Sequence, residues 1–558
     1  MSKLISGRAY YYLVESARVE GKPRIVSQQY LGPAEEVLAR LSGSGPGEPD
    51  RSRHLAFGDL AAVWSVLRRL RVAEIVDEVA GPRRKDAGAS VGAYVALCVA
   101  NRIVAPCSKL AFSKWWATTV GPRLVKIPAA ALDHRRFWDA MEALTPEVLC
   151  EIERRIAAHA QTEFGLDLSG LVLDMTNFAT FIDSGNDAVT IAKRGHAKQK
   201  RFDLRLVGLA LVVTADGAVP VLSHAYPGDR PGVTQFPVVV SELAARFKEL
   251  THGAEQLTVV YDAGQDSAAN QELVEESGLS FVGSLVVSNH PELLAVARSR
   301  FRVVDEGRFP GLTALESRAE ALGADRRVIV THSRTFHERQ ARGFDETTAA
   351  ALRRLSDLSA RLERGKTRRS RAEAEAEIAE ILSPRWLSRV IATDLVGERP
   401  KELRLAFSVD PKGRLRLEAE IFGKRILFTD REDWSAAEVI AAYRSQAIVE
   451  SGFRQLKDRQ VISFSPMYHW TDSKIRVHVL CCVLALAVAH LMRREAARSG
   501  IHMSVRELIG VLSGIEETVL LYEGERGRPR ARRMLTEMGS DQKRLYDLFD
   551  LDAYAPSR

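Results

Sequence analysis

Apolar and polar positions follow different periods along the chain, and each change of period marks a boundary. The first residues, from 10 to 31, alternate around a Glu-Gly-Lys-Pro turn, which predicts a β-hairpin followed by a short helix. A linker rich in Gly, Ser and Pro, from 42 to 52, separates this small module from the next region. From residue 55 to about 160, apolar residues recur at helical spacing between prolines, so we expect a group of helices there.

Near Gly170 the period changes to that of β-strands. We expect three successive strands, a helix over 235–250, a strand that ends at Asp262, a further helix, and a strand at Phe-Val-Gly-Ser-Leu-Val-Val. This order predicts an α/β fold, in which a mixed sheet carries helices on both faces.

Residues 289–430 combine strand patterns with one long charged helix over 347–382. The strands are expected at 327–331, 388–394, 403–409, 415–421 and 425–429. Ala436 to Asp458 lacks Pro and predicts one continuous helix. The predicted units are a hairpin module (1–43), a helical DNA-binding region (54–160), the first part of the sheet region (168–288), a largely β insertion (289–430), the second part of the sheet region (431–498) and a helical tail (499–558).

Composition narrows the class of protein. A chain of 558 residues with 46% hydrophobic residues has enough apolar side chains for several cores, which excludes a disordered chain. Its five cysteines form no Cys-x-x-Cys pair and no signal-like segment opens the chain, so we expect a reducing, cytoplasmic setting without structural zinc. The most apolar run, Val477 to Met492, falls short of the ~20 residues of a membrane span and predicts a core helix.

The net charge of +7 is compatible with nucleic acid, and four basic stretches concentrate it. Residues 101–137 predict a helix-turn-helix variant on DNA or, equally, a basic helical surface with tryptophans in its core. Residues 361–371 predict a solvated helix with ion pairs or a DNA contact. Five arginines between 526 and 533 indicate a flexible arm. The loop from 193 to 205 favours DNA, through Lys193, Arg194, Lys198, Lys200 and Arg201.

Two aspartates stand in or at the end of strongly apolar strands. Asp174 follows Leu-Val-Leu, and Asp262 follows Leu-Thr-Val-Val-Tyr. A buried carboxylate is costly unless it has a partner, and α/β sites lie at strand ends, so both are candidate metal ligands. Asp266 is expected to be the N-cap of the next helix, and Asp183 to lie in a turn.

A third carboxylate, Glu450, lies in the predicted 436–458 helix. At about 100° per residue, it shares a stripe roughly 80° wide with polar residues that donate hydrogen bonds. These are Tyr443, Gln446, Arg454 and Lys457. A carboxylate among such donors suits Mg²⁺ and phosphate, whereas the simpler interpretation is a surface helix with a Glu450–Arg454 pair.

Tyr443, Glu450 and Lys457 also fit the pattern Y-x2-R-x3-E-x6-K, with Gln446 in place of the Arg. With residues 10–32 and 468–488, this stretch resembles bacterial insertion-sequence DDE transposases of the IS-four superfamily. The resemblance implies an RNase H-like core that holds Asp174 on its first strand, Asp262 at the end of its fourth and Glu450 on a later helix, with a β insertion between the last two.

The resemblance also implies a mechanism and partners. Two Mg²⁺ ions, or Mn²⁺ in their place, would assist water and then the freed DNA 3′-OH as nucleophiles, with no covalent protein intermediate. Tyr443 and Lys457, helped by Arg454, would hold the terminal phosphates. The partners would be double-stranded DNA, as terminal inverted repeats and target, and a second copy of the chain, with no membrane. The protein would act in the bacterial cytoplasm, on the nucleoid.

Three alternatives stay open at this point. A domesticated DNA-binding protein would keep the fold and bind DNA without cutting. A structure-specific nuclease of RNase H-like fold would cut without joining. A purely structural scaffold would leave the strand-tip aspartates without a purpose.

Overall fold

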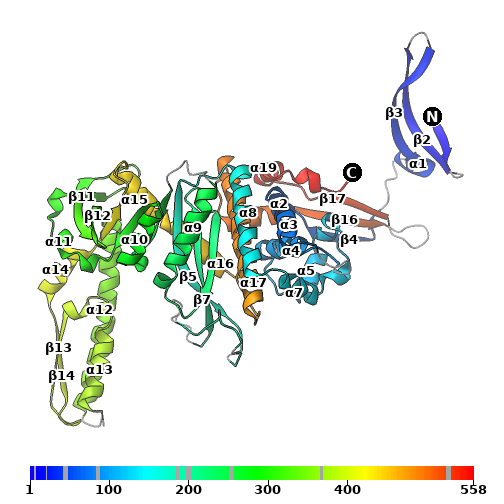
Figure 1. The fold of residues 1–558 in the computed structure, drawn as a ribbon. Helices are drawn as coiled ribbons and strands as arrows, with labels where there is room; N and C mark the ends of the chain where they lie inside the picture. The colour runs from blue at the N-terminus through cyan, green and yellow to red at the C-terminus, as the bar shows by residue number, and fades with distance from the viewer. Residues whose placement is uncertain are drawn as a thin grey trace.

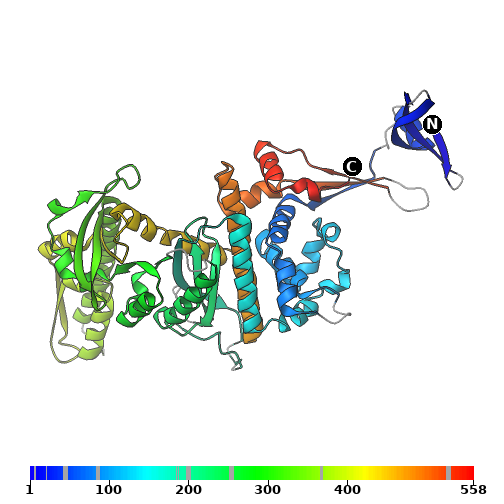
Figure 2. The same ribbon diagram turned by 45° about the horizontal axis from the view of Figure 1, so that its top comes forward.

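The computed structural model describes residues 1–5, 8–19, 22–41, 48–82, 88–183, 185–186, 188–195, 203–250, 257–364, 369–522 and 530–557. The ribbon is elongated, with the N-terminal module at one end and a large sheet region toward the other (Figure 1; Figure 2). The helical region and two long helices, α8 and α17, lie between them.

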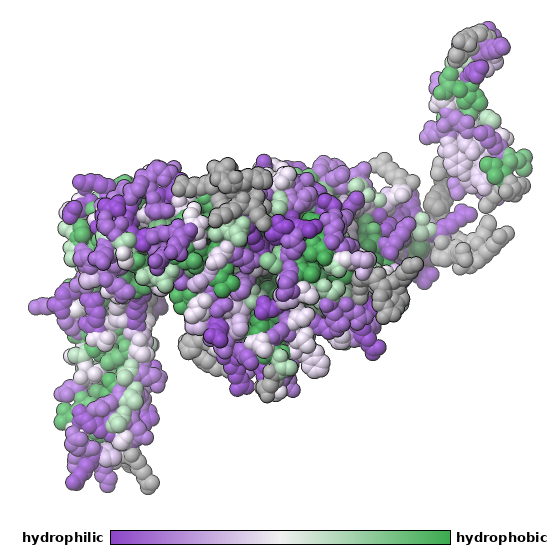
Figure 3. All heavy atoms as spheres, in the orientation of Figure 1, coloured by the Kyte–Doolittle hydropathy of each residue, from purple (hydrophilic) through white to green (hydrophobic). Residues whose placement is uncertain are grey.

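The N-terminal module is a three-stranded antiparallel sheet with one helix. Its strands are β1 (Ser2–Ile5), β2 (Arg8–Val19) and β3 (Lys22–Pro33), and α1 (Ala34–Leu41) follows. The predicted hairpin is β2 and β3, and β1 adds a third strand through the pair Leu4↔Ala9. Apolar side chains remain exposed on this module, including Leu4, Leu13 and Ile25 (Figure 3).

The helical region contains seven helices over the described residues 58–164. They are α2 (Gly58–Arg69), α3 (Val72–Ala80), α4 (Val91–Val104), α5 (Phe112–Ala117), α6 (Gly121–Leu124), α7 (His134–Glu142) and α8 (Pro146–Phe164). Trp116 is buried and its ring stacks on Phe112 at 5.8 Å. Arg102 is buried too, and donates to the Ser463 carbonyl at 3.2 Å. These residues of the basic 101–137 stretch therefore belong to the core.

A nine-stranded sheet forms the centre of the second region, and it is mixed, as the sequence predicts. Its order is β10-β11-β12-β15-β9-β8-β5-β6-β7. Strands β5 (Gly170–Thr180), β6 (Arg205–Thr214) and β7 (Pro220–Pro227) are antiparallel neighbours, while β8 (Thr258–Val260) and β9 (Ser280–Leu285) run parallel to β5. Helices α9 (Phe236–Leu250) and α10 (Ala268–Glu276) follow β7 and β8 in the chain.

Strands of the predicted insertion extend this sheet, which the sequence does not predict. They are β10 (Arg302–Val303), β11 (Leu312–Ala321), β12 (Ala324–Ser333) and β15 (Lys424–Thr429), and β15 pairs with β9 through Ile426↔Leu285. Two helices and two strands of the same segment form an arm, visible at the lower left of Figure 1. They are α12 (Arg334–Glu363), α13 (Arg371–Leu382), β13 (Ile391–Val396) and β14 (Arg404–Val409).

Two expectations within the insertion are wrong. The predicted long helix over 347–382 is two helices, because Ser370 and Glu373 form a capping box that begins α13. The predicted strand 415–421 is part of α14 (Pro411–Ile421), which begins at Pro411 after the N-cap Asp410. Alternating Arg and Leu imitate a strand there, although Leu417 and Ile421 are one helical turn apart and both buried.

The predicted continuous helix 436–458 is also two helices. They are α15 (Ala436–Arg444) and α16 (Gln446–Lys457), and the break is at Ser445. The Ser445 hydroxyl donates to the Ala442 carbonyl, and such a local bond competes with the helical hydrogen bonds.

The predicted helical tail contains two strands. After α18 (Val505–Ser513), β16 (Glu516–Tyr522) pairs with β17 (Arg530–Leu535) and with β4 (Arg51–Ala56), and α19 (Ser540–Leu548) follows. The arginines of the predicted arm at 530, 532 and 533 therefore lie on a strand, and those at 526 and 528 lie outside the described residues. The partner β4 is more than four hundred residues earlier in the chain, so local patterning does not reveal the pairing.

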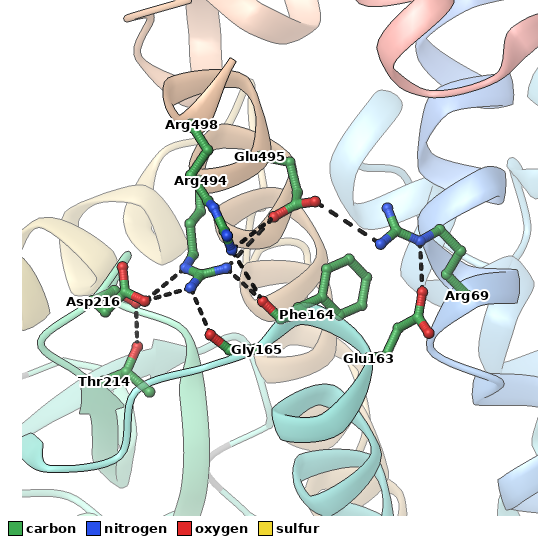
Figure 4. Close-up of polar contacts among 9 residues, drawn as sticks. All are labelled: Arg69, Glu163, Phe164, Gly165, Thr214, Asp216, Arg494, Glu495 and Arg498. Carbon is green, nitrogen blue, oxygen red and sulfur yellow. Dashed lines mark hydrogen bonds and ion pairs between the residues drawn. The ribbon is translucent and has the colours of Figure 1, made fainter. Parts of the chain in front are cut away.

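Helix α17 (Asp472–Arg498) packs against the helical region and against the nine-stranded sheet. Length and composition alone would allow it to cross a membrane, but 94% of its most apolar stretch is buried inside the protein, as expected of a core helix. Near its end, the Arg494 guanidinium bonds to Asp216, to the Phe164 carbonyl at 2.8 Å and to the Gly165 carbonyl at 2.9 Å (Figure 4). Arg494 thereby joins α17, the end of α8 and the β6–β7 turn.

We expect Arg494→Ala to lower the free energy of unfolding by about 2–4 kcal/mol, because it leaves buried carbonyls and a carboxylate without their donor. Chemical denaturation measures this change. Arg498→Ala, one turn further along α17, is the matched control, since that side chain is 61% exposed. Equal effects of the two substitutions would contradict the role given to Arg494.

Candidate active site

The register between β5 and β8 places two of the predicted carboxylates side by side. Val172 pairs with Val260 in the parallel ladder, and Asp174 and Asp262 each follow two residues later. Because side chains alternate along extended backbone, and Asp262 is itself extended, both carboxylates lie on the same face and at the same level of the sheet. Asp174 is half-buried and Asp262 is exposed.

Neighbouring elements hold Asp262 through one of its oxygens. Its Oδ1 accepts from the Ala263 N–H at 2.7 Å and from the Ser284 hydroxyl at 3.2 Å. The Tyr443 hydroxyl, from α15, lies 3.3 Å from the same oxygen and 2.9 Å from Ser284 Oγ. Among the described residues none donates to Oδ2, so this oxygen can face a cation.

Glu450 and Asp262 line one cavity of about 430 Å³. Glu450 is exposed in the second turn of α16, and Tyr443 lies between the two in the cavity wall. Asp174 is not among the lining residues, although it is adjacent to Asp262 through the strand register. Within the described ranges no three His, Cys, Asp or Glu side chains are grouped closely enough to hold a metal ion.

Lys457 ties α16 to the face that carries Asp174. Its ammonium donates to the Thr176 hydroxyl at 2.9 Å and lies 5.3 Å from the centre of the Phe178 ring. Thr176 is two residues beyond Asp174 on β5 and so faces the same way. Glu450 and Lys457 are two helical turns apart, hence on one side of α16. Helix α16 thus places the Glu450 carboxylate at the cavity and the Lys457 ammonium on the face of β5 that carries Asp174.

A family model, Transposase DDE domain, matches residues 166–486, which is more than half of the 558 residues. The chain belongs to the DDE transposase family. The matched range contains Asp174, Asp262 and Glu450.

Other comparisons add less to the assignment of this DDE transposase. No curated protein matches the chain. Among solved structures, it is similar to a piggyBac transposase synaptic complex with hairpin DNA, at 9% identity and a TM-score of 0.36, over 83% of this chain and 82% of that one. The family assignment therefore rests on the domain match.

In this DDE transposase, the helix break at Ser445 divides the polar stripe that the sequence predicts along one helix. Tyr443 is buried and reaches Asp262 from α15, while Gln446 begins α16. Gln446 is buried, and its Nε2 has no hydrogen-bond partner within the described chain. Arg454 is exposed in the last turn of α16. The donors therefore come from two helices rather than from one continuous stripe.

The expectation that Asp266 caps a helix is wrong. Ser267 is the N-cap of α10, where its hydroxyl accepts from the Asn270 N–H at 3.1 Å. Asp266 ends the short 3-10 turn that begins at Asp262, and its Oδ1 is buried without a partner in the described structure. Burial and the Asp262 charge raise the pKa of Asp266 to about 7. In the sequence, the sign that the two carboxylates could interact is the four-residue spacing of Asp262 and Asp266.

Lys193 and Arg194, which are predicted to bind DNA, do not line the cavity. Lys193 pairs with Leu206 through an isolated bridge and Arg194 is exposed next to it. Lys198, Lys200 and Arg201 lie outside the described residues. In the charged helices, Arg361 pairs with Glu377 and Arg371 with Glu375, as expected of a solvated helix with ion pairs.

DDE transposases generally use divalent metal ions. The chemistry of the donors suits such an ion, although the described side chains are not grouped closely enough to hold one. Asp174, Asp262 and Glu450 are hard oxygen donors, and Oδ2 of Asp262 accepts no bond from the described residues. Arginines share the cavity with Asp262 and Glu450, so phosphate oxygens have partners there as well.

We expect Asp266→Asn to stabilise the metal-free protein above pH 7 and to have little effect near pH 4. With its pKa raised to about 7, the folded wild type favours the neutral carboxyl, so its stability falls as pH rises from about 4 to about 7. The difference should reach about 1–2 kcal/mol after allowance for solvent. Urea denaturation in EDTA at pH 4 and pH 8 measures it, and an equal difference at both values would contradict the assignment.

Proposed function

We propose that this DDE transposase is a bacterial insertion-sequence enzyme that binds terminal inverted repeats, cleaves the element's ends and joins the freed 3′-OH to target DNA. The observation that carries the proposal is the placement of Asp174 and Asp262 by one strand register, with Glu450 in the same cavity as Asp262.

The sheet order supports an RNase H-like core. Strands β7, β6, β5, β8 and β9 are consecutive neighbours, with the first three antiparallel and the last two parallel to β5. In such a core the first and fourth strands of the chain are neighbours, so the aspartates on β5 and after β8 meet. Helix α16 then brings Glu450 from a distant part of the sequence.

Asp174, Asp262 and Glu450 are the residues that would hold the metal ions, two Mg²⁺ or Mn²⁺ in their place. The bound ions would stabilise charge on the attacking and leaving oxygens of an in-line displacement at phosphorus. The protein's own groups position the reactants: Tyr443 and Ser284 fix Asp262, and Lys457 and Arg454 offer cations to the terminal phosphates.

We further propose that the enzyme acts as a homodimer on paired DNA ends in the bacterial cytoplasm. Both ends of an element must be cut together, and a twofold assembly presents two equivalent sites. Size-exclusion chromatography with light scattering, with and without end DNA, tests the stoichiometry.

We expect Asp174→Ala, Asp262→Ala and Glu450→Ala each to reduce metal-dependent nicking by at least about 100-fold, because each removes a ligand of the charge-stabilising ions. DNA binding should persist, since these residues are not cations. The assay uses a labelled duplex of the inverted repeat that flanks the gene, with Mg²⁺, Mn²⁺ or EDTA. Asp183→Ala is the control, because Asp183 accepts from the Gly185 N–H in a turn.

The same assay separates the alternatives. Nicking at the repeat boundary followed by joining to a target plasmid supports the transposase. Nicking without joining would identify a nuclease, and binding without nicking in either metal would identify a non-cutting DNA-binding protein.

We expect Lys457→Ala to weaken binding of the end duplex about tenfold, because the substitution removes a charge-assisted hydrogen bond to phosphate. Fluorescence anisotropy measures the affinity. Lys543→Ala on α19, which removes a surface pair with Asp547, is the control. Unchanged affinity in Lys457→Ala would exclude a phosphate contact.

A further inference from the structure

Three arginines outside the carboxylate set line the cavity that contains Asp262 and Glu450. Arg339 comes from α12, Arg425 from β15 and Arg444 from the end of α15. All three are exposed. Arg339 and Arg425 belong to the segment between Asp262 and Glu450, whereas Arg444 lies on the helix before Glu450. We call these three residues the arginine wall.

Aromatic rings hold each guanidinium in place. Arg425 lies 4.9 Å from the centre of the Phe336 ring and donates to the Tyr443 hydroxyl at 3.2 Å. Arg339 lies 5.4 Å from the same Phe336 ring, and Arg444 lies 4.6 Å from the Phe309 ring. A guanidinium held over an aromatic ring keeps N–H groups available to an anion.

The cations lack carboxylate partners within the described part of the chain. No ion pair joins Arg339, Arg425 or Arg444 to an acid there, and the carboxylates that line the cavity are Asp262 and Glu450. Burial and the Arg425 charge lower the pKa of Arg444, as expected of like charges held together. Clustered guanidiniums of this kind are stabilised by a bound anion, and phosphate matches their geometry.

We propose that Arg339, Arg425 and Arg444 bind backbone phosphates of the DNA strand that is cut, and so fix the strand as it passes toward the carboxylates. The inference rests on the proposed function and names the substrate group that this wall recognises. A cavity of about 430 Å³ is in the range that holds a small ligand, so it suits a short piece of one strand.

The test is the salt dependence of binding by the full-length protein. The probe is a fluorescent duplex of the inverted repeat that flanks the gene, titrated in EDTA over a series of KCl concentrations. For the double variant Arg425→Gln and Arg444→Gln, we expect the Kd to rise about tenfold or more. The slope of log K against log salt should fall by about 1 for each phosphate that the variant no longer neutralises. Arg416→Gln on α14 is the matched control, because that arginine is 65% exposed and pairs with Asp410.

Tyr443→Phe separates a direct contact from an indirect one. Arg425 reaches Asp262 through the Tyr443 hydroxyl, but a neutral hydroxyl releases no counterion, so this variant should keep the wild-type salt slope. An equal decrease of slope in Tyr443→Phe, or an unchanged slope in the arginine variant, overturns the inference. Competition with inorganic phosphate at millimolar concentration is a second test. If phosphate displaced DNA from the arginine variant but not from the wild type, the assignment of the phosphate site to these arginines would be wrong.

The experiments distinguish failure of the proposed function from failure of the arginine wall alone. A wild-type protein that neither binds nor nicks the duplex rejects both proposals. A wild type that nicks, with an arginine variant that binds and nicks equally well, rejects only the arginine wall.

Discussion

The parallel pairing of β5 with β8 is the constraint on which the candidate site depends. A shift of one residue in this register would turn Asp262 to the opposite face from Asp174. The pairing is short, from Gly170↔Thr258 to Val172↔Val260, and it is continued on the other side by the parallel pair of β8 with β9. Buried strands on both sides fix the register, because their apolar side chains have no other place to pack.

The insertion contributes to the site because its strands continue the sheet. β15 pairs with β9 and thereby brings Arg425 next to the strand end that carries Asp262. β12 leads directly into α12, which places Phe336 and Arg339 on the same wall. The segment between Asp262 and Glu450 therefore helps to build the cavity and does more than separate the two carboxylates in the sequence.

The sequence predicts local features well and long-range pairings poorly. Strand patterns locate β5, β6, β7, β8 and β9, because their apolar residues alternate or run together between turn signals. They do not reveal the pairing of β4 with β16, since neither strand carries information about a partner far along the chain. The helix break at Ser445 is equally hidden, because serine is tolerated within helices and the bond of its hydroxyl to the Ala442 carbonyl is seen in the structure alone.

The sequence predicts the candidate aspartates because a charged residue in or after a strongly apolar strand pattern is unusual. Residue type alone assigns Asp266 to a cap, although Ser267 is an equally good capping residue and takes that position. The arginine wall is invisible in the sequence, because its members come from three elements with no common motif. Tertiary structure, rather than local pattern, brings them to one cavity.

Metal-directed cleavage of the polypeptide tests the central claim most directly. Fe²⁺ bound in place of Mg²⁺ generates hydroxyl radicals with ascorbate and peroxide, and these cut the backbone near the ligands. The account predicts cuts close to residues 174, 262 and 450 that excess Mg²⁺ suppresses and that Asp262→Ala abolishes. Cuts confined to other positions, or cuts that Asp262→Ala leaves unchanged, would contradict a metal site formed by these three carboxylates.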